Sequence, residues 1–286
     1  MVIWFERISC YVKDCLSLYW LEKSRIKKGD RMYLKVLCDN NSLIDRYYLA
    51  EPALSFYIED GESRILFDTG YSDVFIKNAS KMNIDLNKID TIVLSHGHND
   101  HTGGLRYLRD LKQDVKLICH PNTDERKFYQ GLDISSPVRL DELASNFNVI
   151  RSKEAFKVSE HITFLGEIKR NVQKVSPLEN DELWDDSALV YEDDRGIFII
   201  TGCSHSGICN IIEQAKRITS KAHILGIIGG FHMLNNEKLN RDVSEYFSKL
   251  DIEVCYPCHC TDLLAKIALS KVVSVKEVGV DFDLEL

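Results

Sequence analysis

Short apolar runs separated by turn residues recur from about residue 32 to the end of the chain. An apolar run of roughly four to eight residues bounded by turn signals is typical of a buried β-strand. The runs predict strands at 33–38, 53–59, 64–67, 89–94, 115–119, 162–165, 197–200, 224–228 and 253–256. Asp60-Gly61 separates the second run from the third, and this dipeptide predicts a β-hairpin.

Apolar residues at helical spacing appear between some of these runs. A helix is predicted after residue 207, because an apolar residue recurs every three or four positions there. Its apolar face carries Ile208, Ile211, Ile212, Ala215 and Ile218. Residues 71–82 predict a second helix, and a third is predicted to begin over 105–111.

Two segments show no regular pattern. Residues 1–31 combine tryptophans with mixed charges, and they are either a genuine N-terminal extension or upstream sequence read in frame before an initiator at Met32. The intact mass of the natively expressed protein distinguishes these two interpretations. Residues 121–180 predict loops over a site, and such loops commonly determine substrate specificity. Within them, Arg139, Lys169 and Arg170 are either anion contacts or solvated charges.

The composition fits one large globular domain, or at most two small ones, since 44% of the 286 residues are hydrophobic and 28% are charged. A net charge of −8 argues against nucleic acid as the main partner, because surfaces that bind phosphate backbones are usually basic. No apolar run approaches the roughly 18 residues that cross a bilayer. We therefore predict no nucleic-acid or membrane partner, and the sequence leaves the oligomeric state open.

Nine cysteines are scattered without a disulfide framework, which favours a reduced, cytoplasmic setting. Cys255 and Cys258 form a C-x2-C pair, and Cys260 follows two residues later. Such a pair can hold structural zinc or an iron–sulfur cluster, but it usually needs a second pair, and no other pair in the chain has this spacing. A non-enzymatic metal or iron–sulfur binding protein therefore stays one possible class.

A dense group of metal-ligating side chains follows the predicted strand at 89–94. His96, His98, Asp100 and His101 lie close together in the sequence and precede two glycines. In an extended chain His96 and His98 point the same way, and a turn can aim Asp100 and His101 at a neighbouring point. Polar clusters beside a buried strand are costly unless they are paired. The stretch therefore predicts two adjacent metal positions.

Three further histidines follow later predicted strands. His205 follows the run 197–200, and His232 and His259 follow the last two runs. Each lies beside small residues that let the backbone approach closely, and a random scatter would not produce this arrangement. The other three histidines, His120, His161 and His223, lack this context and are predicted to be structural.

Together these motifs resemble the metallo-β-lactamase fold superfamily of metal-dependent hydrolases. The motifs are Asp68-Thr69-Gly70, the H-x-H-x-D-H run at 96–101, Thr201-Gly202-Cys203 and the late His259. Segments 202–205, 229–232 and 257–261 are similar to the branch labelled dihydropterin ribofuranosyl-aminobenzene phosphate synthase-like. The resemblance covers about residue 32 to the end. It implies an α+β fold for residues 32–286, a four-layer αββα sandwich with two mixed β-sheets.

The resemblance also implies ligands for two divalent metal ions. His96 and His98 would bind the first ion, and Asp100, His101 and His259 would bind the second. Zinc is the predicted metal, with iron and manganese as alternatives, because imidazole and carboxylate suit all three. Asp68 either belongs to a plain turn or orients metal ligands by hydrogen bonding.

The chain departs from the common family pattern at two places. Many relatives have a bridging aspartate where this chain has Cys203, and the thiol either binds metal or fills space as a small buried residue. The third histidine of the first metal site is absent from its usual place. His205 is the predicted replacement, with Asp186 or Asp185 next in line.

The predicted chemistry follows from the two ions, which can lower the pKa of a shared water from about 15.7 to about 7. The resulting hydroxide would attack a phosphoryl or acyl centre, with Asp100 orienting it. His232 would protonate the leaving group or hold a substrate phosphate, or it only caps a strand turn. The leading prediction is a metal-dependent hydrolase acting on a small, anionic phosphorylated or ester substrate. The enzymatic alternative is a transferase that joins a pterin to a phosphoribosyl aminobenzene.

Overall fold

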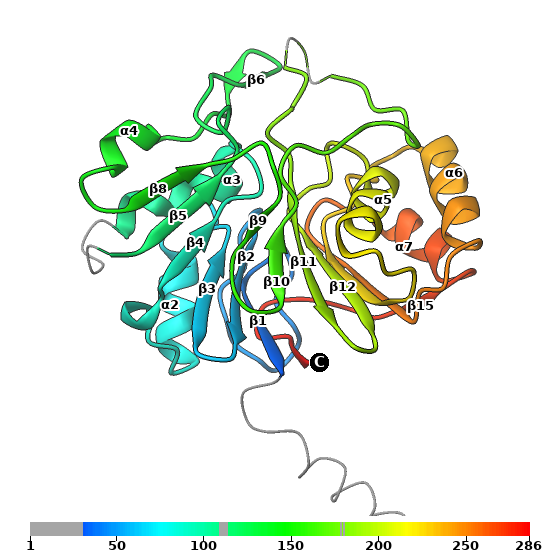
Figure 1. The fold of residues 1–286 in the computed structure, drawn as a ribbon, viewed down its shortest axis with the longest axis horizontal. Helices are drawn as coiled ribbons and strands as arrows, with labels where there is room; N and C mark the ends of the chain where they lie inside the picture. The colour runs from blue at the N-terminus through cyan, green and yellow to red at the C-terminus, as the bar shows by residue number, and fades with distance from the viewer. Residues whose placement is uncertain (1–30, 109–113, 178, 180) are drawn as a thin grey trace, which may run out of the picture.

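The computed structural model describes residues 31–108, 114–177, 179 and 181–286. The two interpretations of the N-terminal segment 1–31 concern residues outside this description, since Arg31 alone of that segment is described. Two β-sheets pack face to face at the centre of the molecule, and helices cover the outer face of each sheet (Figure 1). This arrangement is the four-layer αββα sandwich that the family resemblance implies.

Each of the two large sheets has seven strands. The first contains, in spatial order, β16 (Asp283–Glu285), β1 (Met32–Cys38), β2 (Ser55–Asp60), β3 (Ser63–Phe67), β4 (Thr91–Val93), β5 (Lys116–Cys119) and β8 (Asn148–Arg151). The second contains β15 (Ser274–Val275), β14 (Val254–Pro257), β13 (Ile224–Gly229), β12 (Gly196–Thr201), β11 (Ala188–Asp193), β10 (Ile162–Phe164) and β9 (Phe156–Lys157). A separate hairpin pairs β6 (Phe128–Tyr129) with β7 (Leu132–Asp133).

The helices lie between these strands in the chain. The α-helices are α2 (Val74–Lys81), α3 (Asn99–Thr102), α4 (Leu140–Leu143), α5 (Ile208–Thr219), α6 (Glu237–Phe247) and α7 (Leu263–Leu269). Two 3₁₀ segments, η1 (Leu86–Lys88) and η2 (Gly103–Tyr107), complete the set among the described residues. None of these helices combines the length and apolar character needed to cross a bilayer.

Both sheets are mixed. In the first sheet the pairing is antiparallel from β16 through β1 and β2 to β3. From β3 through β4 and β5 to β8 the pairing is parallel. The second sheet repeats this division, with β9 to β12 antiparallel and β12 to β15 parallel. Parallel strands end at the same edge of a sheet, so the loops after β12, β13 and β14 meet there.

Alternating side chains of the strands fill separate hydrophobic layers. In β3, Ile65 and Phe67 face the layer between the two sheets, while Leu66 packs with α2 residues on the outer face. In β12, Phe198 faces the central layer and Ile199 packs toward the α5 side. Strands that are buried on both faces read as continuous apolar runs, which is the pattern that the sequence shows.

The predicted strands are confirmed, and so are the hairpin at Asp60-Gly61 and the helices α2 and α5. The helix predicted over 105–111 is wrong where the structure describes it, because a 3₁₀ turn occupies Gly103–Tyr107 and residues 109–113 lie outside the description. Gly104 lies in this turn. A Cβ atom there would lie 2.0 Å from the carbonyl oxygen of Thr69, so only glycine allows the backbone to approach Thr69 this closely.

Candidate metal centre

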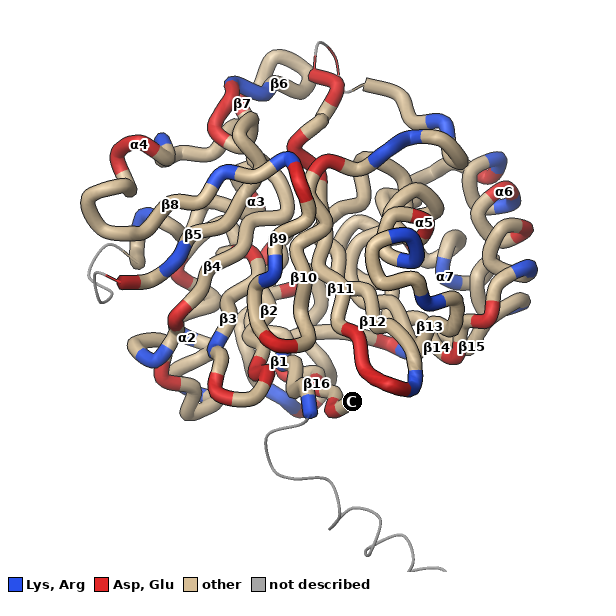
Figure 2. Tube along the Cα trace, in the orientation of Figure 1, with Lys and Arg blue, Asp and Glu red and all other residues tan. Residues whose placement is uncertain are grey.

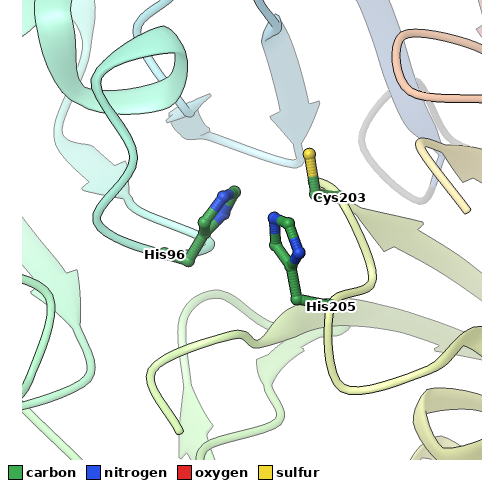
Figure 3. Close-up of side chains that lie close together, drawn as sticks. All are labelled: His96, Cys203 and His205. Carbon is green, nitrogen blue, oxygen red and sulfur yellow. The ribbon is translucent and has the colours of Figure 1, made fainter. Parts of the chain in front are cut away.

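The predicted metal-ligating residues converge where the two sheets open at one edge. His96 and His98 follow β4, and Cys203 and His205 follow β12. His259 follows β14 and lies beside His101. Figure 3 shows the side chains of His96, Cys203 and His205 pointing toward one another from opposite loops. Residues that are more than a hundred positions apart therefore share one site.

A first group of imidazoles surrounds His96. Its Nε2 lies 3.0 Å from Nδ1 of His98, and both rings have centroids 4.8 Å from the ring of His205. Potential ligand atoms of His96, Cys203 and His205 all lie within 4.8 Å of one another. The Nε2 atoms of His98 and His205 are buried without a hydrogen-bond partner. Such orphaned atoms are costly, and a bound metal ion would satisfy them.

A second group lies beside the first. His101 Nε2 is 3.2 Å from His259 Nε2, and Asp100 Oδ2 is 3.6 Å from the former and 3.4 Å from the latter. Cys203 Sγ lies 3.2 Å from His101 Nε2 and so adjoins both groups. The donors are nitrogen, carboxylate oxygen and sulfur, a set that zinc accepts readily. These side chains could hold a metal ion.

Asp68 holds the second group in place. Its Oδ2 accepts a hydrogen bond of 2.7 Å from Nδ1 of His101, and Oδ1 accepts one of 2.7 Å from the amide of Ser95. The Ser95 hydroxyl bonds to the same carboxylate at 2.7 Å. Protonation of His101 at Nδ1 leaves Nε2 as the atom directed into the site. These hydrogen bonds orient the imidazole of His101.

His259 has orienting partners that the sequence reasoning missed. Its Nδ1 lies 2.8 Å from Oδ1 of Asn40, and its amide donates to Oδ1 of Asp39 at 3.0 Å. Both partners follow β1, some 220 residues away in the chain. Asp39 and Asn40 directly follow a predicted strand, and this position is the sequence signal that also identified the histidines.

Several residues around the site adopt left-handed backbone conformations. Asp68, Ser204, His232 and His259 have φ values of 57°, 60°, 48° and 51°. For residues other than glycine this region is sparsely populated and costs roughly 1–3 kcal/mol. Such conformations cluster at functional sites, where the surrounding structure enforces them.

Burial sets the protonation of the first group. It lowers the pKa of His98 to about 3, and it lowers the pKa values of His96 and His205 well below their ordinary value. Neutral imidazoles keep a lone pair for a metal ion. For His101 burial acts in the same direction, but Asp100 and Asp68 outweigh it and raise the pKa to about 9. Burial opposes ionisation of Asp100, yet His101 and His259 hold its pKa below the ordinary value.

Asp185 and Asp186, the two aspartates considered as further metal ligands, form hydrogen bonds to other groups. Asp185 accepts from the amide of Gly97 at 2.7 Å and from Nζ of Lys127 at 2.9 Å. Asp186 accepts through Oδ2 from the amide of Ser206 at 2.8 Å, while its Oδ1 is buried without a partner. Among the described residues neither aspartate belongs to a compact group of potential ligands, whereas His205 does.

Lys127 is a second feature that sequence reasoning missed. Its side chain is 1% exposed, and Nζ lies 2.8 Å from Asp181 and 2.9 Å from Asp185. Through Asp185 it fixes Gly97, the residue between the first two histidines. A lysine in a polar loop is normally solvated, so no sequence signal distinguished this one.

His232 lies at the exposed side of the centre, with its ring centroid 4.2 Å from that of His205. It forms a third compact group with Cys203 and Cys260. Burial lowers the pKa of His232, but Cys260 outweighs it and the net direction is upward. The other two cysteines of the C-x2-C region lie elsewhere, since Cys255 packs in the helix-facing core and Cys258 packs between the sheets.

A cavity of about 810 Å³ opens onto both groups. Tyr71, Tyr129 and Leu234 line its outer part, and each is nearly half exposed. No lysine or arginine is among its described lining residues. The size suits a small-molecule ligand.

Comparisons with known proteins agree with this geometry. Residues 49–218 match the Metallo-beta-lactamase superfamily. The chain is 32% identical over 256 residues to the uncharacterized protein MJ0448 of Methanocaldococcus jannaschii, covering 83% of this chain and 94% of that protein. It is 28% identical over 269 residues to a 7,8-dihydropterin-6-methyl-4-(beta-D-ribofuranosyl)-aminobenzene-5'-phosphate synthase of the same organism, covering 84% and 91%.

Among solved structures, the chain is similar to Tm1679, described as a metal-dependent hydrolase of the beta-lactamase superfamily. The TM-score is 0.78 at 27% identity, and the match covers 89% of this chain and 99% of the other. The sheet order, the clustered ligands and these matches agree with one another. The chain belongs to the metallo-β-lactamase superfamily.

Proposed function

We propose that the protein is a metal-dependent hydrolase that acts on a small phosphorylated or ester substrate. The observation that carries the proposal is the convergence of two groups of metal-ligating side chains on Cys203, with the Nε2 atoms of His98 and His205 buried and unpaired. A structural zinc site is usually closed by four protein ligands. These groups instead line an open cavity that a substrate can enter.

In this proposal His96, His98 and His205 bind one divalent ion, and Asp100, His101 and His259 bind the other. Cys203 contributes to one or both ions. Metal ions held by these residues would supply a water with a pKa of about 7 and would polarise the substrate oxygen. Zinc is the proposed metal, because histidine, carboxylate and thiolate together suit it.

The chain itself positions the reactants. Asp100 Oδ2 faces the space between His101 and His259, where it can accept a hydrogen bond from the attacking water. His232 lies at the exposed side of the centre, where its ring can donate a proton to the oxygen of a leaving group. Asp68 and Asn40 keep the imidazoles of His101 and His259 oriented.

We also propose that the substrate is a small anionic molecule and not a nucleic acid or a membrane surface. Acidic and basic residues are interspersed along the described chain in Figure 2, and the net charge of the chain is −8. The positions of lysine and arginine are dispersed along the tube in that view, whereas proteins that track a phosphate backbone usually cluster them. A transferase reaction of the pterin synthase type is the second candidate, supported by the similarity to the synthase of Methanocaldococcus jannaschii.

Metal content and turnover of site variants test the proposal. His98→Ala and Asp100→Asn should each remove at least one metal ion per chain and nearly all activity toward phosphodiesters or lactones. His223→Ala is the matched control, because that half-exposed histidine bonds to Asp251 and Glu253 away from the site. Retention of both ions by both site variants would refute the ligand assignment. Turnover only in a pterin condensation assay would favour the transferase.

A further inference from the structure

A second, smaller cavity of about 350 Å³ adjoins the metal-centre cavity. Tyr71 and Asn99 line both cavities, and Asn99 lies between the proposed metal ligands His98 and Asp100. Three arginines, Arg106, Arg126 and Arg139, line the smaller cavity, which we call the arginine pocket. The two cavities are therefore neighbours. Three arginines line the arginine pocket, whereas no arginine or lysine is among the described lining residues of the larger cavity.

Two of the three arginines are free to bind an anion. Asp133 pairs with Arg126 at 3.0 Å. The other lining carboxylate, Asp124, accepts from the amide of Leu140 at 3.0 Å. Arg106 donates through Nε to the carbonyl of Gly103 at 2.8 Å, which leaves its terminal nitrogens available. No carboxylate pairs with Arg106 or Arg139 among the described residues.

The arginine pocket is fixed to the metal centre through the backbone. Arg106 lies in η2, directly after α3, the short helix that begins after His98 and contains Asp100. The opposite wall is attached to the same segment, because the amide of Asn99 donates to the carbonyl of Ile134 at 2.9 Å and Ser135 forms a β-bridge with His98. A group bound in the pocket is thus held at a defined position relative to the proposed metal ligands.

We propose that the arginine pocket binds a terminal phosphate group of the substrate, while the rest of the substrate passes Tyr71 into the metal-centre cavity. Guanidinium groups bind phosphate oxygens through paired, charge-assisted hydrogen bonds. In a chain with a net charge of −8, a pocket with two unpaired arginines is a local site for an anion. The substrate class is a small molecule with a phosphate at one end, separate from the bond that is cleaved. The assignment of that bond rests on the proposed function, but phosphate binding in the pocket does not.

The test is calorimetric binding of phenylphosphonate, which carries an anionic head that a hydrolase cannot remove as an ester. Benzyl alcohol is the uncharged comparison. The metal-loaded wild-type protein should bind phenylphosphonate more tightly than benzyl alcohol. The double variant Arg106→Ala/Arg139→Ala should bind it about tenfold more weakly or not at all, because hydrogen bonds to charged groups are lost. Arg241→Ala, an exposed arginine on α6, should bind as the wild type does.

His98→Ala separates the arginine pocket from the metal centre. The proposal predicts that this variant still binds phenylphosphonate, even though the proposed function predicts that it loses metal and turnover. Equal affinity of wild type and double variant, or loss of binding only in His98→Ala, would overturn the proposal by assigning the anion to the metals. Failure of the wild type to hydrolyse any ester, with phosphonate binding still dependent on Arg106 and Arg139, would refute the proposed function alone.

Discussion

Replacing Lys127 with methionine tests how much this buried lysine stabilises the structure around the candidate metal centre. The lysine side chain is 1% exposed, and its ammonium group lies 2.9 Å from the fully buried Asp185 and 2.8 Å from Asp181. Methionine has a similar length without the charge. The substitution leaves the Asp185 carboxylate with the amide of Gly97 as its remaining hydrogen-bond donor.

The expected loss of stability is large for a single substitution. Breaking a buried ion pair by removing one partner costs about 3–5 kcal/mol, because the remaining charge is buried without compensation. Burial raises the pKa of Asp185, and Lys127 opposes that rise, so the carboxyl should take up a proton more readily in the variant. The control Lys238→Met removes a lysine whose side chain is 78% exposed in a pair with Asp242, and such surface pairs contribute at most about 1 kcal/mol.

Urea unfolding of the two variants measures the difference. Lys127→Met should lower the free energy of unfolding by at least about 3 kcal/mol, and Lys238→Met by less than about 1 kcal/mol. Adding Asp185→Asn to Lys127→Met should recover part of the loss, because no buried charge is then left alone. Equal effects of the two lysine variants would refute the reasoning.

Three further predictions concern the site. Cys203→Ser should lower the zinc bound per chain, measured by elemental analysis, because Sγ adjoins both ligand groups; an unchanged value would mean that the thiol only fills space. Asp68→Asn should weaken metal affinity about 10–100-fold in a chelator competition, whereas an unaltered affinity would exclude its orienting role. Burial raises the pKa of Asp186 from 3.8 to about 6 against the hydrogen bonds from Ser206, so this carboxyl makes the folded state less stable as pH rises through that window. In metal-free protein, Asp186→Asn should therefore gain stability relative to wild type between those pH values, by up to about 3 kcal/mol; parallel pH curves would contradict this.

Side chains at strand ends were predictable from the sequence because the chain geometry there is regular. His96 and His98 follow an apolar run, and so do His205 and His259. Parallel strands bring such ends to one edge whatever lies between them in the chain. This rule accounts for His205 and His259, whose strands share the second sheet, whereas their approach to His96 and His98 depends on the packing of the two sheets against each other.

Contacts made across long sequence separations were not predictable. Lys127 reaches an aspartate 58 residues away, and Asp39 meets His259 across 220 residues. A single polar residue in an irregular segment carries no period that would indicate burial. Arg139 illustrates the same limit, since the sequence allows a solvated charge or an anion contact and gives no sign that Arg139 lines one cavity with Arg106.

The two-ion centre is tested most directly by anomalous X-ray diffraction from crystals of the zinc-loaded protein, recorded on both sides of the zinc absorption edge. The proposal predicts two anomalous peaks. One should lie within about 2.0–2.3 Å of the nitrogens of His96, His98 and His205, and the other within that distance of His101 and His259 nitrogens and an Asp100 oxygen. A single ion held by Cys203, His232 and Cys260, with no peak beside His98, would contradict it.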